Sequence, residues 1–230
     1  MFANFDFDVI RRSLSYLFFD GMTFTLTLTG LSALGGLIFG TLIALMRLSG
    51  YRLLSFVAAA YVDFMRSLPL VLVIFWFYFL VPYIGQWLTG SSRPVRVGAF
   101  ASSLITFMLF EAAYFAEIMR AGIQSISKGQ PSAASALGLT YGQTMRYVVL
   151  PQAFRNMLPV LLTQTIVLFQ DTSLVYVLSI PDFLGAASKV AQRDGRLVEM
   201  YLFAAVVYFV ISSIASFGVR RLQARIAIVR

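Results

Sequence analysis

The sequence predicts an all-α integral membrane protein with five membrane-spanning helices. The chain is 59% hydrophobic and only 12% charged, with a mean hydropathy of +0.82, which is too apolar for a domain with a polar exterior. Its apolar stretches reach the roughly 20 residues that cross a hydrocarbon core of ~30 Å, and short polar segments separate them. We expect one transmembrane domain, residues 1–230, with spans at about 22–46, 62–82, 97–119, 157–178 and 198–219.

The composition also excludes several kinds of chemistry. The sequence has no Cys and no His, so it lacks thiolates and the commonest general base and metal ligand. An integral membrane enzyme would be left with carboxylate or serine chemistry, and we expect no metal site. The net charge of +8 comes from cations at the ends of apolar segments, where they would face lipid headgroups rather than nucleic acid.

The N-terminal segment has the pattern of an amphipathic helix. Ile10, Leu14, Leu17 and Phe18 fall at i, i+4, i+7 and i+8, which is one face of a helix. We expect this helix to lie along the membrane surface, before the first span begins.

The first span, about 22–46, contains a stripe of small residues. Ser32, Gly36, Gly40 and Ala44 recur at every fourth position. Such a stripe lets two helices approach closely inside a membrane. The pattern predicts helix packing and carries no information about a substrate.

The second and third spans contain charged residues that need partners. Asp63 and Arg66 are three residues apart in the helix that leads to the strongly apolar run after Pro69, so they are expected to pair. Glu111 lies within the third span. A carboxylate at that depth is costly unless it is paired, for example with an Arg, or lines a wet cavity.

The fourth span is interrupted by the polar run Gln170-Asp171-Thr172-Ser173. One interpretation is a polar site for a transported solute. The other is a broken helix in which the side chains hydrogen-bond their own backbone. The second interpretation is favoured for Thr172 and Ser173, and both stay open for Asp171. Residues 180–197, which carry Pro, Gly and charges of both signs, are expected to form a loop before the fifth span.

The segment at about 128–151, called the 128–151 loop below, differs from the spans on either side. It reads as two short helices joined by a tight turn. Pro131 suits the first turn of a helix, and Gly138 suits the left-handed position that ends one. Thr140 and Gln143 have the spacing of a capping box, and Pro151 marks the transition to the next span.

The first of these short helices, residues 132–137, offers almost no side-chain bulk. Another surface can therefore approach its backbone closely. A partner-binding element is one interpretation of the loop, and an ordinary helical hairpin without a partner is the other.

Lys and Arg indicate the orientation of the chain. Five spans put the termini on opposite sides of the membrane. With the N-terminus outside and the C-terminus in the cytoplasm, 11 cations lie on the cytoplasmic side and 7 on the outer side. The 128–151 loop is then cytoplasmic. Since no internal repeat is visible, the chain is more typical of a pore formed by dimerisation than of a secondary carrier built from two repeats.

Several segments resemble one protein family, the membrane permease subunits of ATP-binding-cassette (ABC) importers in the polar amino acid branch. The loop signature of that family is Glu-Ala-Ala, three residues, Gly, nine residues, Ile, one residue, Leu-Pro. The segments that carry the resemblance are Gly21–Leu26, Arg66–Leu70, Glu117–Ile123, Asp171–Leu174 and, within the loop, Ser132-Ala133-Ala134, Gly138, Val148 and Leu150-Pro151.

The loop departs from the signature at one important position. Ser132 stands where the family has Glu, so a salt bridge from this position to an ATPase is not expected, although the docking shape is retained. Val148 replaces the similar Ile. A literal Glu111-Ala112-Ala113 occurs upstream, but no Gly follows it at the required distance.

The resemblance implies a type I importer fold and a set of partners. These are a second permease, identical or similar, two copies of a cytoplasmic ABC ATPase, a periplasmic or lipid-anchored solute-binding protein, and an amino acid substrate. The chain lacks G-x-x-x-x-G-K-[ST], so ATP and Mg²⁺ would be bound by the ATPase and the chain itself would have no cofactor. The implied location is the bacterial cytoplasmic (inner) membrane.

The resemblance also implies two sets of functional residues. The ATPase-coupling residues are Gly129, Gln130, Ser132, Ala133, Ala134, Leu137, Gly138, Leu150 and Pro151. The substrate-path residues are Glu111, Gln164, Gln170, Asp171, Thr172 and Ser173.

The segments GQPSAASALG and LFQDTSLVYVLS are most similar to permeases of glutamate/aspartate importers. Another polar amino acid is the alternative substrate, and a self-contained carrier or channel is the alternative class. Asp171 and Glu111 would repel an anionic substrate unless they bind its ammonium group or are neutralised. An Arg or helix N-termini would then hold its carboxylates. Arg66 and Arg155 are the candidates, although arginines at such positions are more often interfacial anchors than ligands.

Overall fold

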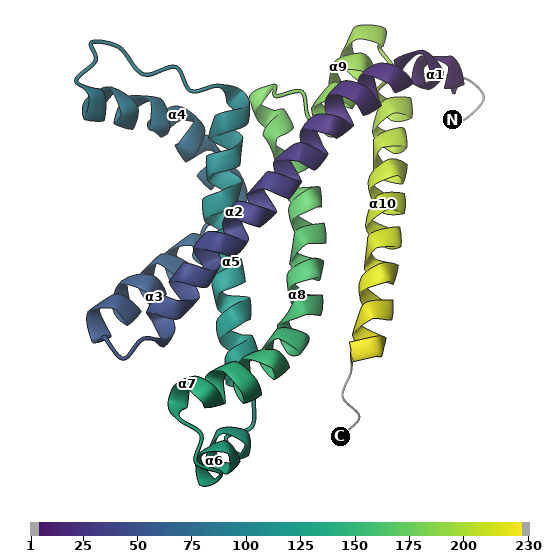
Figure 1. Ribbon diagram of the computed structural model, residues 1–230. Helices are drawn as coiled ribbons and strands as arrows, with labels where there is room; N and C mark the ends of the chain where they lie inside the picture. Colours follow the sequence, from purple (N-terminus) through teal and green to yellow (C-terminus); the bar gives the residue numbers. More distant parts are fainter. Residues whose placement is uncertain (1–4, 227–230) are drawn as a thin grey trace. The chain divides into compact units, whose positions relative to one another are not determined.

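The computed structural model describes residues 5–226, in which every regular element is helical (Figure 1). Short π-helical segments, Tyr16–Met22 and Met145–Val149, and the 3₁₀ segment Thr172–Leu178 join some of the α-helices. The α-helices are α1 Phe7–Ser15, α2 Thr23–Leu48, α3 Arg52–Ser67, α4 Leu70–Thr89, α5 Ala99–Gln124, α6 Gly129–Ala136, α7 Tyr141–Thr144, α8 Leu150–Asp171, α9 Phe183–Asp194 and α10 Leu197–Ile226.

The five-span, all-α prediction is confirmed for the described part of the chain. Five helical stretches are long and apolar enough to cross a membrane. They are Phe7–Leu48, Leu70–Thr89, Ala99–Gln124, Tyr141–Leu178 and Leu197–Ile226. Arg230, one of the cations counted on the cytoplasmic side, lies outside the described residues.

The second membrane-length helix begins later than the predicted span of about 62–82. The helix α3 ends at Ser67, and Leu68 has an extended backbone with φ −97° and ψ 141°. The ring of Pro69 disfavours the helical conformation for the residue before it, so the chain breaks here and α4 starts at Leu70. Residues 62–67 therefore belong to a separate helix.

The predicted apolar face of the N-terminal helix is buried only in part: Leu17 belongs to the core cluster and Ile10 packs against it, while Leu14 and Phe18 are exposed. The buried side of the helix is made by Val9, Ser13 and Leu17. A π-helical segment continues α1 into α2, so the first 42-residue stretch is one helix rather than a separate surface piece followed by a span.

Residues 180–197, expected to form a loop, contain the helix α9. The side chain of Asp182 caps its start by accepting hydrogen bonds from the N–H groups of Leu184 (3.1 Å) and Gly185 (2.9 Å). Gly195, with φ +67°, ends it in the left-handed conformation. Both capping residues are visible in the sequence, but the surrounding charges favoured a loop.

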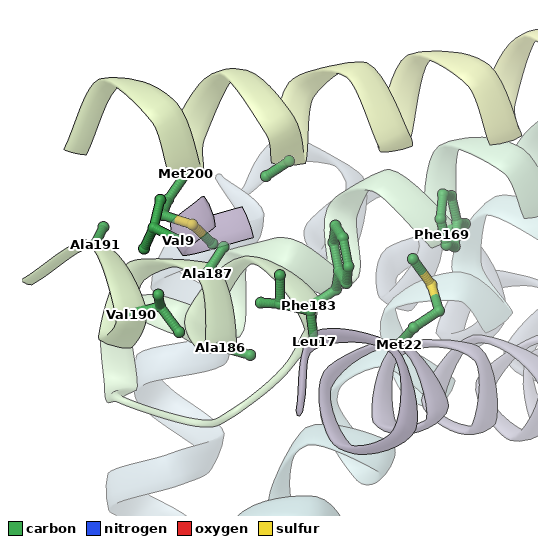
Figure 2. Close-up of a cluster of buried hydrophobic side chains, with 11 residues drawn as sticks. Val9, Leu17, Met22, Phe169, Phe183, Ala186, Ala187, Val190, Ala191 and Met200 are labelled. Atoms are coloured by element: carbon green, nitrogen blue, oxygen red, sulfur yellow. The ribbon is translucent and has the colours of Figure 1, made fainter. Parts of the chain in front are cut away.

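The described chain packs as two compact units. One comprises residues 5–34, 69–108 and 166–215, and the other 35–68, 109–165 and 216–226. In the first unit, α9 packs against the N-terminal helical stretch through a buried cluster that Figure 2 shows. Its members are Val9, Leu17, Met22, Phe169, Phe183, Ala186, Ala187, Val190, Ala191, Met200 and Ala204.

In the second unit, α2 and α5 lie in close contact along the small-residue stripe. A Cβ at Gly36 would lie 2.9 Å from Glu111 Cβ, and one at Gly40 would lie 2.9 Å from Phe115 Cβ and 3.0 Å from the carbonyl oxygen of Ala112. These distances are shorter than side chains tolerate. The prediction of close helix packing is thus confirmed at Gly36 and Gly40.

Candidate functional site

The 128–151 loop begins with α6, an eight-residue helix. It starts at Gly129 rather than at the predicted residue 132, because Pro131 occupies its first turn, where a missing N–H costs no hydrogen bond. Ser132 Oγ donates a hydrogen bond to the carbonyl oxygen of Lys128 (3.0 Å). The hydroxyl that replaces the family's Glu is therefore engaged within its own helix.

The helix α6 ends in a Schellman motif. Gly138 is left-handed with φ +86°, and its N–H bonds to the carbonyl of Ser135 (3.0 Å). The N–H of Leu139 bonds to the carbonyl of Ala134 (3.1 Å). A Cβ on Gly138 would meet no atom within 4 Å, so the backbone conformation, not lack of space, requires glycine here.

The next helix begins with the predicted capping box. Gln143 N–H donates to Thr140 Oγ1 (3.4 Å), and Thr140 N–H donates to Gln143 Oε1 (2.9 Å). The helix then continues through the π-helical segment Met145–Val149 into α8 without a break. Pro151 therefore lies in the second position of α8. The wider π turn before it accommodates a ring that cannot bond to the carbonyl four residues earlier.

The side chains of α6 face two ways. Ala134 is buried and lies on the side that packs against the second half of the loop. Ser132, Ala133, Ala136 and Leu137 are exposed, and Leu137 is 81% exposed. The helix thus presents a surface of very small side chains with one large apolar residue at its end.

Behind the loop, a hollow of about 300 Å³ lies between α5 and α8. Asn156 donates a hydrogen bond to Ser125 Oγ (2.9 Å) at its margin, and a Cβ at Gly122 would lie 2.9 Å from Met157 Cβ. The helices that enter and leave the loop are therefore in direct contact.

An ion cluster that the sequence reasoning missed lies around Glu117 in the same unit. Its carboxylate accepts hydrogen bonds from Arg47 and, through both oxygens, from Arg120 (3.1 and 2.5 Å). Arg66 Nη1 is 3.9 Å from Glu117, and Arg47 is 4.0 Å from Asp63. The expected Asp63–Arg66 pair is replaced, since each residue has another partner.

The three-residue spacing of Glu117 and Arg120 in the sequence is typical of an ion pair within a helix, so this pair of the cluster could have been predicted. The contribution of Arg47, 70 residues earlier, required the fold. Arg66 also stacks over the Tyr114 ring at 5.4 Å from its centre. This arginine is therefore committed to α5, whereas Arg155, the other candidate for substrate carboxylates, is exposed.

The predicted substrate-path residues are divided between the two units. In one unit, Glu111 is fully buried, and Gln164 Nε2 donates a hydrogen bond to its Oε1 (3.3 Å). This bond brings the predicted path residues Glu111 and Gln164 together.

In the other unit, the predicted polar interruption changes the backbone. The α-helix ends at Asp171, and a 3₁₀ segment follows. Gln170 bonds to Ser212 Oγ of α10 (3.0 Å). Thr172 is buried and donates to the carbonyl of Phe169 (2.7 Å), as the broken-helix interpretation expects. Asp171 and Ser173 are half-buried.

Five membrane-length helices in the described part of the chain define an integral membrane protein. The chain belongs to the family described as binding-protein-dependent transport system inner membrane component, whose model matches residues 36–228. The family places the protein in the inner membrane and identifies it as the permease of an importer whose ATPase and solute-binding protein are separate subunits.

Individual relatives agree with this assignment. The chain is 53% identical to the glutamate/aspartate import permease protein GltK of Escherichia coli, over 97% of this chain and 99% of that protein. It is 33% identical to the glutamine transport system permease protein GlnP of Escherichia coli K12, over 98% and 99% of the two chains.

Solved structures agree as well. A chain from the crystal structure of an amino acid ABC transporter with histidines superposes with a TM-score of 0.85 at 33% identity, covering 96% of this chain and 98% of that one. An inward-facing MetNI methionine ABC transporter shares the fold, with a TM-score of 0.75 at 19% identity and coverage of 93% and 97%.

Proposed function

We propose that this chain forms half of the translocation path of an ATP-driven importer of glutamate and aspartate. The observation that carries the proposal is the 53% identity to the glutamate/aspartate import permease GltK over almost the whole of both chains. A relative named for glutamine transport is 33% identical over a similar length. Glutamine is therefore the competitor against which the substrate preference is tested.

In the proposed assembly, two permeases, identical or similar, each receive one ABC ATPase on the 128–151 loop. The N-terminus lies outside and the C-terminus in the cytoplasm, as the cation bias favours. ATP and Mg²⁺ are bound by the ATPase. ATP drives transport only through the difference in its binding free energy between inward-open and outward-open states, and the loop transmits this difference to the helices.

The proposed substrate path includes the buried Glu111, its half-buried partner Gln164 and the polar run Gln170–Ser173. The two sets are supported differently. A carboxylate buried within a membrane-length helix is costly and is typically functional. Asp171 lies where an α-helix changes to a 3₁₀ segment, which is typical of a site lined by irregular backbone. The exposed Arg155 is the remaining arginine candidate for the substrate carboxylates.

The test is uptake by proteoliposomes that contain the permease, its ABC ATPase and its solute-binding protein. We expect uptake of glutamate or aspartate that requires internal ATP. Excess glutamine should inhibit this uptake only weakly. Uptake by the chain without the ATPase would contradict the proposed class. A preference for glutamine would contradict the substrate alone.

A substitution in the loop tests the coupling. Gly138→Trp requires a strained left-handed backbone at a bulky residue, so we expect normal membrane insertion but loss of substrate-stimulated ATP hydrolysis. Gly50→Trp is the matched control, because Gly50 also has no neighbouring atom within 4 Å of its Cβ position but has no positive φ. Full stimulated hydrolysis by Gly138→Trp would show that the loop does not couple ATP to transport.

A substitution in the path tests the substrate site. Asp171→Asn keeps the shape of the side chain and removes its charge, so we expect a changed transport rate or substrate preference. Unchanged values for both would remove Asp171 from the proposed path.

A further inference from the structure

The segment 90–98, which joins α4 to α5, is fixed against the last turns of α4. Gly90, with φ +64°, ends the helix in the left-handed conformation, and the segment then returns along it to the start of α5 (Figure 1). Val95 N–H donates a hydrogen bond to the carbonyl oxygen of Pro82 (3.0 Å). A Cβ at Gly85 would lie only 3.1 Å from Val95 Cβ. The segment is therefore packed on the helix at close range.

This packing leaves an open hollow of about 500 Å³ between the helix and the segment. The helix contributes the rings of Phe79, Pro82 and Tyr83 to its wall. The segment contributes Val97 and the side chain of Arg96, which is exposed. The hollow thus combines an apolar wall with a cation that is open to the surroundings.

The positive charge of the segment is not balanced by a neighbouring carboxylate. Arg93 and Arg96 are both exposed, and neither forms an ion pair within the described residues 5–226. The chain has no Asp or Glu between Asp63 and Glu111. An anion from outside the chain would therefore supply the counter-charge that this part of the sequence lacks.

We propose that the hollow binds an anionic phospholipid, whose phosphate pairs with Arg96 and Arg93 and whose first acyl carbons lie against Phe79 and Tyr83. The helix α4 is long and apolar enough to cross a membrane, so the hollow at its end lies at the level of the headgroups. The planar guanidinium group matches the geometry of a phosphate, and basic pockets at a membrane boundary are typical of headgroup binding.

An acidic surface of a partner protein is the alternative occupant. In the proposed orientation, this end of α4 faces the solute-binding protein. Lipid is favoured because the apolar surface does not stop at the hollow: Leu80, Ile84 and Trp87 are exposed along the same helix. Tyr83 and Trp87 are the aromatic residues that typically lie at a membrane interface. A phospholipid would cover both the cations and the apolar side chains, whereas an acidic soluble surface would cover only the cations.

Quenching of Trp fluorescence by brominated lipids tests the site in the full chain. The chain has two Trp residues, and Trp76→Phe leaves Trp87, which is four residues after Tyr83 and so on the same face of α4. In nanodiscs of phosphatidylcholine, phosphatidylglycerol with brominated acyl chains then reports how often an anionic lipid lies beside Trp87. Brominated phosphatidylcholine at the same mole fraction measures the background from ordinary lipid contact.

We expect phosphatidylglycerol to be preferred over phosphatidylcholine by about tenfold or more, because each arginine near an anionic headgroup changes the preference about fivefold. Arg96→Gln should lower the preference by about that factor, and Arg93→Gln combined with Arg96→Gln should remove it. Arg96→Lys keeps the charge but not the planar fork, so it should recover part of the loss. Equal quenching by the two lipids in the chain with both arginines would overturn the proposal.

The matched control removes two arginines elsewhere. Arg220 and Arg221 are exposed residues of α10 and do not line the hollow. Arg220→Gln combined with Arg221→Gln should leave the quenching of Trp87 by phosphatidylglycerol unchanged. An equal loss in this control would show that the lipid follows the total charge of the chain, which would overturn a site at α4.

A filling variant separates a shaped site from the general attraction of cations to an anionic membrane. Val97→Phe keeps both arginines and places a ring in the hollow that Val97 lines. We expect it to lower the preference for phosphatidylglycerol to that of Arg96→Gln, with thermal unfolding confirming that the variant is folded. An unchanged preference would show that the hollow is not part of the site.

Two further measurements exclude other ligands. Glycerol 3-phosphate carries a phosphate without acyl chains, so it should not relieve the quenching, and relief would assign the hollow to a soluble phosphate ester. The solute-binding protein should bind the wild type and the Arg93 and Arg96 double variant equally well. Weaker binding of the double variant, with an unchanged lipid preference, would assign the arginines to that protein. None of these measurements requires transport, so the proposed function stands or fails independently of them.

Discussion

The contact between α2 and α5 predicts a large effect from a single methyl group at Gly40. A Cβ there would lie 2.9 Å from Phe115 Cβ and 3.0 Å from the carbonyl oxygen of Ala112. Neither atom is at the end of a flexible side chain, so the two helices must move apart. Overpacking of this kind costs about 1–3 kcal/mol. Against it stands a gain of about 1 kcal/mol, because alanine is a better helix former than glycine.

Gly30→Ala in the same helix isolates the two contributions. Its Cβ would meet no atom within 4 Å, so this variant should show only the gain in helix propensity. The two variants should then differ in stability by the overpacking cost alone, which corresponds to a difference in Tm of roughly 2–12 °C for a chain of this size. Thermal unfolding of the purified chain in detergent measures it. A Tm for Gly40→Ala equal to or above that of Gly30→Ala would refute the close contact.

Two further predictions concern charged side chains. Glu117→Gln leaves Arg47 and Arg120 without their anion, so we expect a loss of about 1–3 kcal/mol of stability. This loss should be measured as a lower Tm at low salt. An unchanged Tm would show that the ion cluster does not stabilise the fold. Burial raises the pKa of Asp182 from 3.8 to about 7 although backbone N–H groups oppose the shift, so the protonated form is favoured by folding. Stability should therefore fall as the pH rises from about 4 to about 7 and then level off. Asp182→Asn should lose this dependence in Tm measured at pH 5 and pH 8, and an equal pH dependence in both proteins would contradict the assignment.

The parts of the fold that the sequence predicts well are those fixed by neighbours in the chain. The turn at Gly138 depends on one backbone conformation, and the capping box of Thr140 and Gln143 depends on residues three apart. Both form as predicted. The break at Pro69 was equally readable, because the residue before a proline avoids the helical region, but the apolar run across it favoured a longer span.

The features of the fold that the sequence did not predict depend on tertiary contacts, or on neighbouring residues that favour different structures. Arg47 reaches Glu117 only because α2 and α5 pack closely over their glycines, and no spacing in the sequence expresses that contact. The helix α9 has a capping Asp182 and a terminating Gly195, yet its helical state is stabilised by the buried cluster it forms with the N-terminal stretch. The charged residues of this segment predicted a loop, but the packing of its apolar residues in the buried cluster stabilises the helix.

Packing also determines how the 128–151 loop can act in the proposed importer. The loop is not a free appendage. The helix α5 leads into it, and a continuous helix from Tyr141 to Asp171 leaves it. The bond between Ser125 and Asn156 and the close approach of Gly122 to Met157 join the two helices just behind it. Since α6 ends in a Schellman motif and α7 begins with a capping box, we expect that a displacement imposed on α6 is not absorbed by unwinding of the turn between them. In the proposed importer we expect it to pass to α5 and α8 together, and the ion pairs of Glu117 with Arg47 and Arg66 connect α5 to α2 and α3.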